Sequence, residues 1–194
     1  ALGIRGWGEA AVVKYEFTDK ILEHDGCTLH QIRRLSDGEI GGWIEKESNL
    51  SQEGTCWVYD DAWVCDSAEV YGNALVSGDA LVCDSAKVSG YARVSGDAKV
   101  YGNAEVSGNA EVSGTAWVYG NAEVYGDALV YGDVKVFDNA KVFGAALVFG
   151  NALVHGNAKV SGNACISGNA LVHGNAKVSG TAWISGTSRV SGEV

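Results

Sequence analysis

Proline and methionine are absent from the 194 residues, and bases are scarce, with 14 lysines and arginines against 24 acidic residues. The missing methionine predicts that the numbering starts after an initiator or a processing site. No apolar run reaches the roughly 18 residues that a membrane-spanning helix needs, which argues against a membrane as partner. The net charge of −10 argues against a nucleic-acid backbone as partner.

The charge is spread unevenly along the chain. Residues 1–97 hold 17 acidic and 8 basic residues, whereas residues 98–194 hold 7 acidic and 6 basic residues. One end of the molecule should therefore be acidic. A solvated surface that aids solubility is the plain interpretation. A phage accessory protein that binds a host protein through this acidic end is an alternative.

What the chain does have is one six-residue unit repeated 23 times without a break, from Cys56 to Glu193. The unit reads A-x-V-x-G-[N/D], with Ala first in 20 hexads, Val third in 21 and Gly fifth in 19. A fixed short period indicates that each unit stacks on its neighbours instead of folding alone. Ala and Val share one face of a short strand, and Gly followed by Asn or Asp makes a tight corner.

The second position of the hexad shows how many sides the stack has. Every third hexad carries a charge there, whereas sorting by every second hexad separates nothing. One coil therefore consists of three hexads, one to each face, which predicts an all-β fold, a three-sided parallel β-helix, and not a meander of hairpins. The charged column consists of Glu69, Lys87, Glu105, Glu123, Lys141, Lys159 and Lys177.

The period divides the chain into residues 1–13, an extension of unknown role, residues 14–55, an N-terminal β cap, and residues 56–194, the β-helix. Asp25-Gly26 lies between two strand-like runs, which is a hairpin signal. We expect this β-hairpin cap to cover the open end of the coil, because a bare strand edge invites unwanted pairing. No such cap follows the last hexad, which predicts a chain stopped short or an end that pairs with another copy.

The pattern V-x-G-N-A-x resembles the hexapeptide repeat of left-handed parallel β-helices. With KYEFTD, LHQIRRLSDGEI, GGWIEKESNLSQEG and CWVYDDA before it, the chain resembles the YdcK-like proteins, which are bacterial and prophage-associated hexapeptide-repeat proteins. The resemblance covers residues 14 to about 190. It implies a left-handed helix, although ordinary parallel crossovers are right-handed, and a cytoplasmic protein of a bacterium or phage. It implies no known reaction.

Hexapeptide-repeat β-helices are often acyltransferases in which a histidine near a subunit interface is the general base. His155 and His173 are the candidates, since both occupy position four, three hexads apart, and should stack on one face. Those enzymes usually carry loops that build an acceptor pocket, and no loop interrupts the 23 hexads. A structural or protein-binding role without a cofactor is therefore favoured over catalysis, and an acyltransferase-like enzyme is the alternative.

The acidic end offers candidate metal ligands. Asp61, Asp79 and Asp97 share one corner of the coil, and a calcium ion would relieve the repulsion between stacked carboxylates, but the spacing fits no calcium loop. Cys65 and Cys83 should stack on adjacent coils at a distance that permits a disulfide. The odd number of cysteines, five, favours free thiols in a reducing cytoplasm. No cysteine spacing resembles a zinc site, and no metal is expected.

Outward apolar side chains favour self-association, because a contiguous exposed apolar surface usually marks an interface. We therefore expect a homo-oligomer, and two C-terminal ends meeting would give a closed dimer. The lateral interface should hold Trp63, Leu81, Trp117, Leu153 and Leu171 in one outward column, with Tyr101, Tyr119 and Phe137 beside it.

Overall fold

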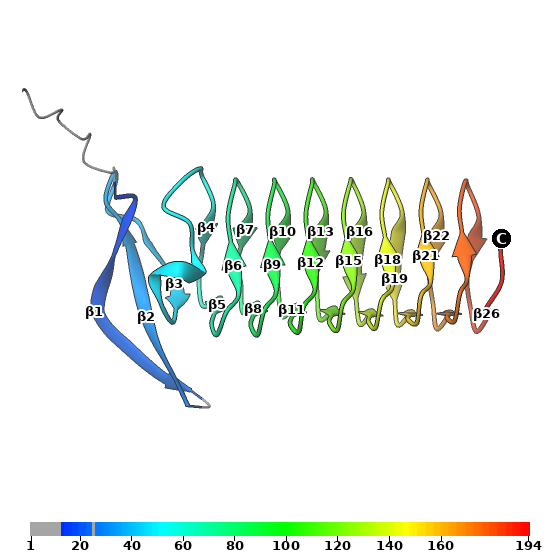
Figure 1. Cartoon of the computed structure of the whole chain (residues 1–194), viewed down its shortest axis with the longest axis horizontal. Coiled ribbons are helices and arrows are strands. Elements are labelled where there is room, and N and C mark those ends of the chain that lie inside the picture. The colour runs from blue at the N-terminus through cyan, green and yellow to red at the C-terminus, as the bar shows by residue number, and fades with distance from the viewer. Residues whose placement is uncertain (1–12, 25) are drawn as a thin grey trace, which may run out of the picture.

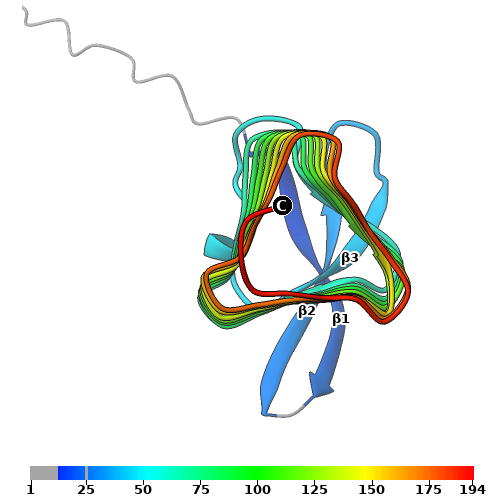
Figure 2. The same ribbon diagram turned by 90° about the vertical axis from the view of Figure 1, so that its right-hand side faces the viewer.

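The computed structural model describes residues 13–24 and 26–194 as a rod of parallel coils with a twisted hairpin at its N-terminal end (Figure 1). Seen along the rod, the coils superpose as a triangle (Figure 2). The predicted three-sided parallel β-helix is therefore confirmed. The left hand that the resemblance implies stays a prediction, and residues 1–12 of the expected extension lie outside the described residues.

Each hexad contributes one short strand, which pairs in parallel with the equivalent strands of the neighbouring coils, three hexads away along the chain. The three sides of the triangle are called faces A, B and C. Face A of the rod consists of β5 (Trp63–Val64), β8 (Leu81–Val82), β11 (Lys99–Val100), β14 (Trp117–Val118), β17 (Lys135–Val136), β20 (Leu153–Val154), β23 (Leu171–Val172) and β26 (Arg189–Val190).

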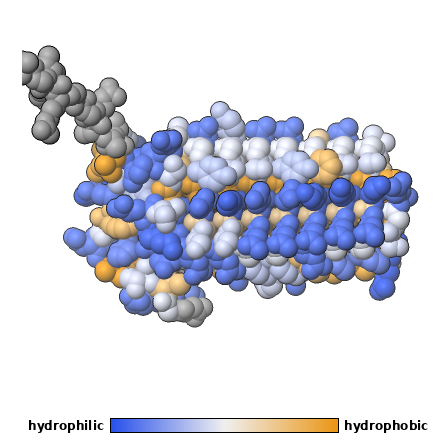
Figure 3. Space-filling model, in the orientation of Figure 1, coloured by the Kyte–Doolittle hydropathy of each residue, from blue (hydrophilic) through white to orange (hydrophobic). Residues whose placement is uncertain are grey.

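Face B carries the charged column that the sequence predicts. Figure 3 shows hydrophilic side chains in continuous rows along the side that faces the viewer. This face consists of β6 (Glu69–Val70), β9 (Lys87–Val88), β12 (Glu105–Val106), β15 (Glu123–Val124), β18 (Lys141–Val142), β21 (Lys159–Val160) and β24 (Lys177–Val178).

Face C closes the triangle and has the most varied outer surface. It consists of β4 (Trp57–Val58), β7 (Leu75–Val76), β10 (Arg93–Val94), β13 (Glu111–Ser113), β16 (Leu129–Gly132), β19 (Leu147–Gly150), β22 (Cys165–Ile166) and β25 (Trp183–Ile184).

The interior of the rod is built from the first and third residue of each hexad. Val88 and Val106 on face B are both 0% exposed, as are the Ala and Val residues along most of the rod. Adjacent coils are joined by backbone hydrogen bonds, and the Ser89 N–H donates to the Val106 carbonyl at 2.9 Å. The core is therefore narrow and filled by small side chains, so added volume has nowhere to go.

The corners require a backbone with positive φ, which Gly provides and Asp tolerates. A Cβ on Gly108, with φ +69°, would lie 2.9 Å from both the N and the O of Gly126 on the next coil. Where Asp replaces Gly, its carboxylate can accept a hydrogen bond from the next coil. Asp84, with φ 59°, accepts the Gly102 N–H at 2.9 Å. Carboxylates at the other three substituted corners, Asp60, Asp66 and Asp138, accept the equivalent N–H.

The cap begins with the predicted hairpin. β1 (Tyr15–His24) and β2 (Cys27–Arg34) pair antiparallel, with His24 opposite Cys27 at the end of the ladder. Gly26 has φ +85°, and Asp25 lies outside the described residues. The hairpin is longer than one side of the triangle, so its far part projects beyond the outline of the rod (Figure 2).

The solenoid begins inside the segment expected to be cap. β3 (Ile40–Ile44) pairs antiparallel with β2 and parallel with β5, so it is the first rung of face A. The 3₁₀-helix η1 (Glu47–Asn49) makes a corner, and Leu50 bridges to Val70 on face B. No helix in the described part of the chain is long and apolar enough to cross a membrane.

Single large side chains close this end of the core. Tyr15 is 2% exposed, and its hydroxyl donates to the carbonyls of Leu50 at 2.8 Å and Glu47 at 3.1 Å. Burial, and secondarily the charge of Glu47, raises the pKa of Tyr15 well above its usual value. Asn49 is 0% exposed, and its side-chain amide donates to the carbonyl of Ala68 at 2.9 Å.

Candidate functional site

Face A carries a ladder of side chains from position four of successive hexads. The rings of Tyr101, Tyr119 and Phe137 stack with centroids 4.9 and 5.0 Å apart. His155 continues the stack 4.7 Å from Phe137, and His173 follows at 5.8 Å. The two histidines therefore lie on one face, as their spacing of three hexads predicts.

His155 has a carboxylate partner that the sequence analysis did not identify. Its Nδ1 lies 3.5 Å from Oδ2 of Asp138, and its side chain is 31% exposed. The same carboxylate oxygen accepts the Gly156 N–H at 3.1 Å, so the backbone holds it beside the imidazole. The sequence signal for this contact is Asp138 itself, which replaces the corner Gly one coil before His155.

His173 lacks the equivalent arrangement. The corner residue of the coil before it is Gly156, which has no side chain to offer. Ring stacking and carboxylate contact therefore single out His155, since an imidazole held by a carboxylate can serve as a general base.

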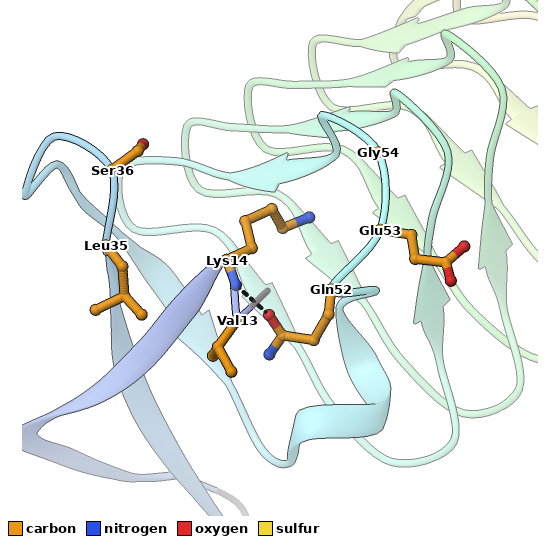
Figure 4. A pocket seen from close by; sticks show the side chains of 7 residues that line it. All are labelled: Val13, Lys14, Leu35, Ser36, Gln52, Glu53 and Gly54. Atoms are coloured by element: carbon orange, nitrogen blue, oxygen red, sulfur yellow. Dashed lines mark hydrogen bonds between the residues drawn. The ribbon is translucent and has the colours of Figure 1, made fainter. Parts of the chain in front are cut away.

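Two hollows lie around the cap, at a distance from His155 along the rod. One of about 860 Å³ opens between the start of β1 and the two turns next to it (Figure 4). The Lys14 N–H donates to Oε1 of Gln52 at 2.8 Å, and the Lys14 amino group donates to the Cys56 carbonyl at 2.9 Å. The lining residues are Val13, Lys14, Leu35, Ser36, Gln52, Glu53 and Gly54.

A smaller hollow, of about 250 Å³, lies between the hairpin tip and the first coils of face A. Three of its lining residues are the free cysteines Cys27, Cys65 and Cys83. The Sγ atoms of Cys65 and Cys83 and a carboxylate oxygen of Asp66 all lie within 4.8 Å of one another. Cys27, Glu45 and Asp66 form a second group within the same limit.

These thiols influence one another. The Cys65 thiol donates to Cys83, which raises the pKa of Cys65 and lowers that of Cys83. Desolvation and the nearby carboxylates of Asp66 and Glu45 raise the pKa of Cys27. The cluster combines soft sulfur ligands with negative charge, and the sequence analysis missed it because Cys27 and Glu45 lie outside the period.

The candidate calcium ligands from the sequence lie elsewhere. Asp61, Asp79 and Asp97 are exposed at successive corners of the rod. In the described part of the chain, the groups of three or more potential ligands within reach of one another are the two cysteine–carboxylate groups. The three aspartates stay candidate ligands only.

The predicted lateral interface forms one column but is not continuously apolar. Lys99 and Lys135 interrupt it, and their amino groups lie 5.4 and 4.6 Å from the Trp117 ring centroid. At its start, the His24 ring packs edge-on against Trp63 at 4.5 Å. The column is therefore broken by charge and contacted by the hairpin. Its members pair in the order Trp63, Leu81, Lys99, Trp117, Lys135, Leu153 and Leu171.

Face C carries apolar side chains that are more exposed than the half-buried ones of the predicted column. Trp183 is 72% exposed, Tyr131 39% and Leu129 38%. Leu129 pairs with Leu147, which pairs with Cys165, and Cys165 pairs with Trp183, so no charge interrupts this stretch.

Comparison with known proteins agrees with the repeat. Residues 68–84, which include β6 and β8, match the YdcK beta solenoid repeat. The chain is similar to the uncharacterized acetyltransferase YdcK of Escherichia coli (strain K12), with 44% identity over 52 residues. This match covers 23% of the chain and 16% of that relative's length. The chain therefore resembles the YdcK beta solenoid repeat over these residues and is distantly similar to the E. coli protein.

Proposed function

We propose that the chain is an acyltransferase-like β-solenoid in which His155 is the general base. The observation that carries this proposal is the imidazole of His155 held 3.5 Å from the Asp138 carboxylate. The E. coli relative, which is named an acetyltransferase, supports the reaction class. The similarity covers only a small part of that protein, so the chemistry rests on the pair itself.

The geometry assigns roles to the two ring nitrogens. Asp138 faces Nδ1, which leaves Nε2 to accept the proton of an amine or hydroxyl. The deprotonated amine or hydroxyl attacks the carbonyl of an acyl thioester, and the carbon–sulfur bond breaks. The imidazolium then returns the proton to the leaving thiolate. The Phe137 ring, stacked against the imidazole at 4.7 Å, restricts its rotation.

Self-association is part of this proposal, because 23 uninterrupted hexads provide no loop to enclose an acceptor. A second copy along the edge of face A would supply the missing walls beside His155. A bacterial or phage-encoded protein of the cytoplasm would have acyl thioesters available, and the bacterial relative supports that origin.

The test is release of coenzyme A from acetyl-CoA in the presence of a panel of small amines and hydroxyl compounds. His155→Gln should reduce turnover by about 10²–10⁴-fold, the usual contribution of a general base. Asp138→Asn keeps a residue that tolerates positive φ and should cost about tenfold.

His173→Gln is the matched control and should leave turnover unchanged, since that ring has no carboxylate beneath it. No turnover by the unaltered chain across the panel, or equal losses in both histidine variants, would overturn the assignment.

A second candidate is a non-enzymatic rod that self-associates through face C. The exposure of Trp183, at 72%, together with Leu129 and Tyr131, favours it. Light scattering should show an oligomer that Trp183→Ser with Leu129→Ser dissociates. Trp117→Ser on face A is the control, and dissociation by that variant instead would move the interface to face A.

A further inference from the structure

The hollow under the hairpin tip holds sulfur and oxygen ligands from three separate parts of the chain. Cys27 opens β2, Glu45 follows β3, and Cys65 and Cys83 follow β5 and β8. Asp66 belongs to both ligand groups, so its carboxylate lies within 4.8 Å of the thiols on each side. This convergence of the hairpin with two coils differs from the ordinary ladders of the rod, each of which stacks residues from a single position of the hexad.

We propose that this hollow binds one zinc ion through the thiolates of Cys27, Cys65 and Cys83 and the carboxylate of Asp66. Zinc takes four ligands of this kind, and at bond lengths near 2.3 Å two sulfur ligands lie about 3.7 Å apart. The ligand atoms of Cys65, Cys83 and Asp66 lie within 4.8 Å of one another, and Cys27 lies within the same distance of the Asp66 carboxylate. Side-chain rotation of Cys27 toward the other two thiols would complete that geometry. Calcium and magnesium prefer oxygen alone, so three thiols select a softer ion.

The surroundings prepare the carboxylate for this role. Oδ2 of Asp66 accepts the Asp84 N–H at 3.3 Å, and its own N–H donates to the Glu45 carboxylate. Cys65 is 8% exposed, which places the sulfur inside the protein and not on its surface. The nearby carboxylates of Glu45 and Asp84 add negative charge that a divalent cation would offset.

The bound ion would fasten the hairpin to the rod. Cys27 lies next to the turn of the hairpin, whereas the other three ligands lie on the first coils. Since binding energy from a site formed only in the folded state is folding energy, zinc should stabilise the cap more than the distant coils. This role is independent of the acyl transfer proposed for His155.

The experiment titrates the reduced, metal-stripped full chain with Co²⁺ under anaerobic conditions and then displaces it with Zn²⁺. One equivalent should bind, with tetrahedral cobalt absorption and thiolate charge-transfer bands. Cys83→Ser and Cys65→Ser should weaken binding by more than about 100-fold. Cys27→Ser should remove about one third of the charge-transfer intensity, as expected for one of three sulfur ligands.

Two controls separate ligands from neighbours. Cys165→Ser removes a thiol on β22 of face C and should change nothing. Asp66→Asn should weaken binding at least about tenfold, whereas Asp84→Asn, at the equivalent corner one coil further on, should not. Both corners have positive φ, which Asn tolerates, so these variants keep the fold.

Hydrogen exchange provides the second readout. Zinc should slow exchange of the amides of β2 in the unaltered chain and not in Cys83→Ser. Absence of a one-to-one complex, a Cys165→Ser variant as weak as Cys83→Ser, or a Cys65–Cys83 disulfide that forms with no metal uptake by the reduced chain would each overturn the proposal.

Discussion

The rod and the cap bury their side chains in different ways. The rod repeats the same two small residues, so each coil makes nearly the same contacts as the next. The cap buries single large groups, such as Tyr15 and Asn49, each with its own hydrogen-bond partners. Stability in the rod is therefore distributed over many similar coils, as in other repeat proteins, whereas the cap depends on a few specific contacts.

The largest effect should come from overfilling the rod. Val124, which is 0% exposed, sits in the middle of a core made of small residues. Val124→Phe should lower the free energy of unfolding by about 3 kcal/mol, the upper part of the usual range for overpacking. Chemical denaturation measures this loss. An unchanged midpoint would show that the coil can widen, and the tight-core description would be wrong.

The second effect compares a corner of the rod with one of the cap. Gly108→Ala and Gly38→Ala both place a side chain at positive φ, which costs about 1–2 kcal/mol. At Gly38 the new Cβ meets nothing within 4 Å, whereas at Gly108 it meets the backbone of Gly126 at 2.9 Å. The rod variant should therefore lose about 1 kcal/mol more in thermal or chemical unfolding.

Gly108→Asp refines this comparison. The chain already uses Asp at four such corners, where the carboxylate accepts an N–H from the next coil. The Asp variant should therefore be more stable than the Ala variant, in spite of its larger side chain. The reverse order would show that these four aspartates are tolerated and not selected by the hydrogen bond.

The rod could be predicted from sequence because its period converts spacing along the chain into distance in space. Positions three hexads apart become neighbours, so the pairs Tyr101–Tyr119 and His155–His173 were predictable. Asp138 was missed because its offset from His155 is one position short of a full coil, which joins a corner of one coil to a strand of the next. The charges of Lys99 and Lys135 were in the sequence, and their interruption of the apolar column could have been predicted.

The cap could be predicted only in part, because it lacks the period. The hairpin follows from local turn chemistry at positions 25 and 26. The approach of Cys27 and Glu45 to Asp66 depends instead on the angle at which the hairpin crosses the first coils. No local pattern sets that angle, so cysteine spacing alone could not predict that the three thiols line one hollow.

The third effect concerns a buried hydroxyl of the cap. Tyr15→Phe removes the hydroxyl proton that the Leu50 and Glu47 carbonyls share and should cost about 1–2 kcal/mol at neutral pH. The pKa of Tyr15 is raised in the folded chain, chiefly by burial. Above about pH 10, the unfolded chain loses this proton while the folded chain keeps it, so stability falls as pH rises.

Phe has no proton to lose, so the difference between the two proteins should shrink between pH 10 and 11. Denaturation at pH 8 and pH 11 measures it, and the other tyrosines contribute equally to both proteins. A difference that stays constant with pH would show that the hydroxyl ionises as easily in the folded chain as in the unfolded one.

The smallest effects should come from the charged column of face B. Lys141 lies 2.6 Å from Glu123, but both side chains are 35% exposed, and Glu105 pairs with Glu123 on the other side. Glu123→Gln removes one attraction and one repulsion, so the free energy of unfolding should change by less than about 0.5 kcal/mol.

Lys159 lies between Lys141 and Lys177, so Lys159→Glu should replace two repulsions by two attractions and stabilise the rod by about 0.5 kcal/mol at low salt. The gain should disappear in about 1 M salt, where the screening length is near 3 Å. A gain that persists there would have to come from packing, and the column would then resemble the interior of the rod more than its surface.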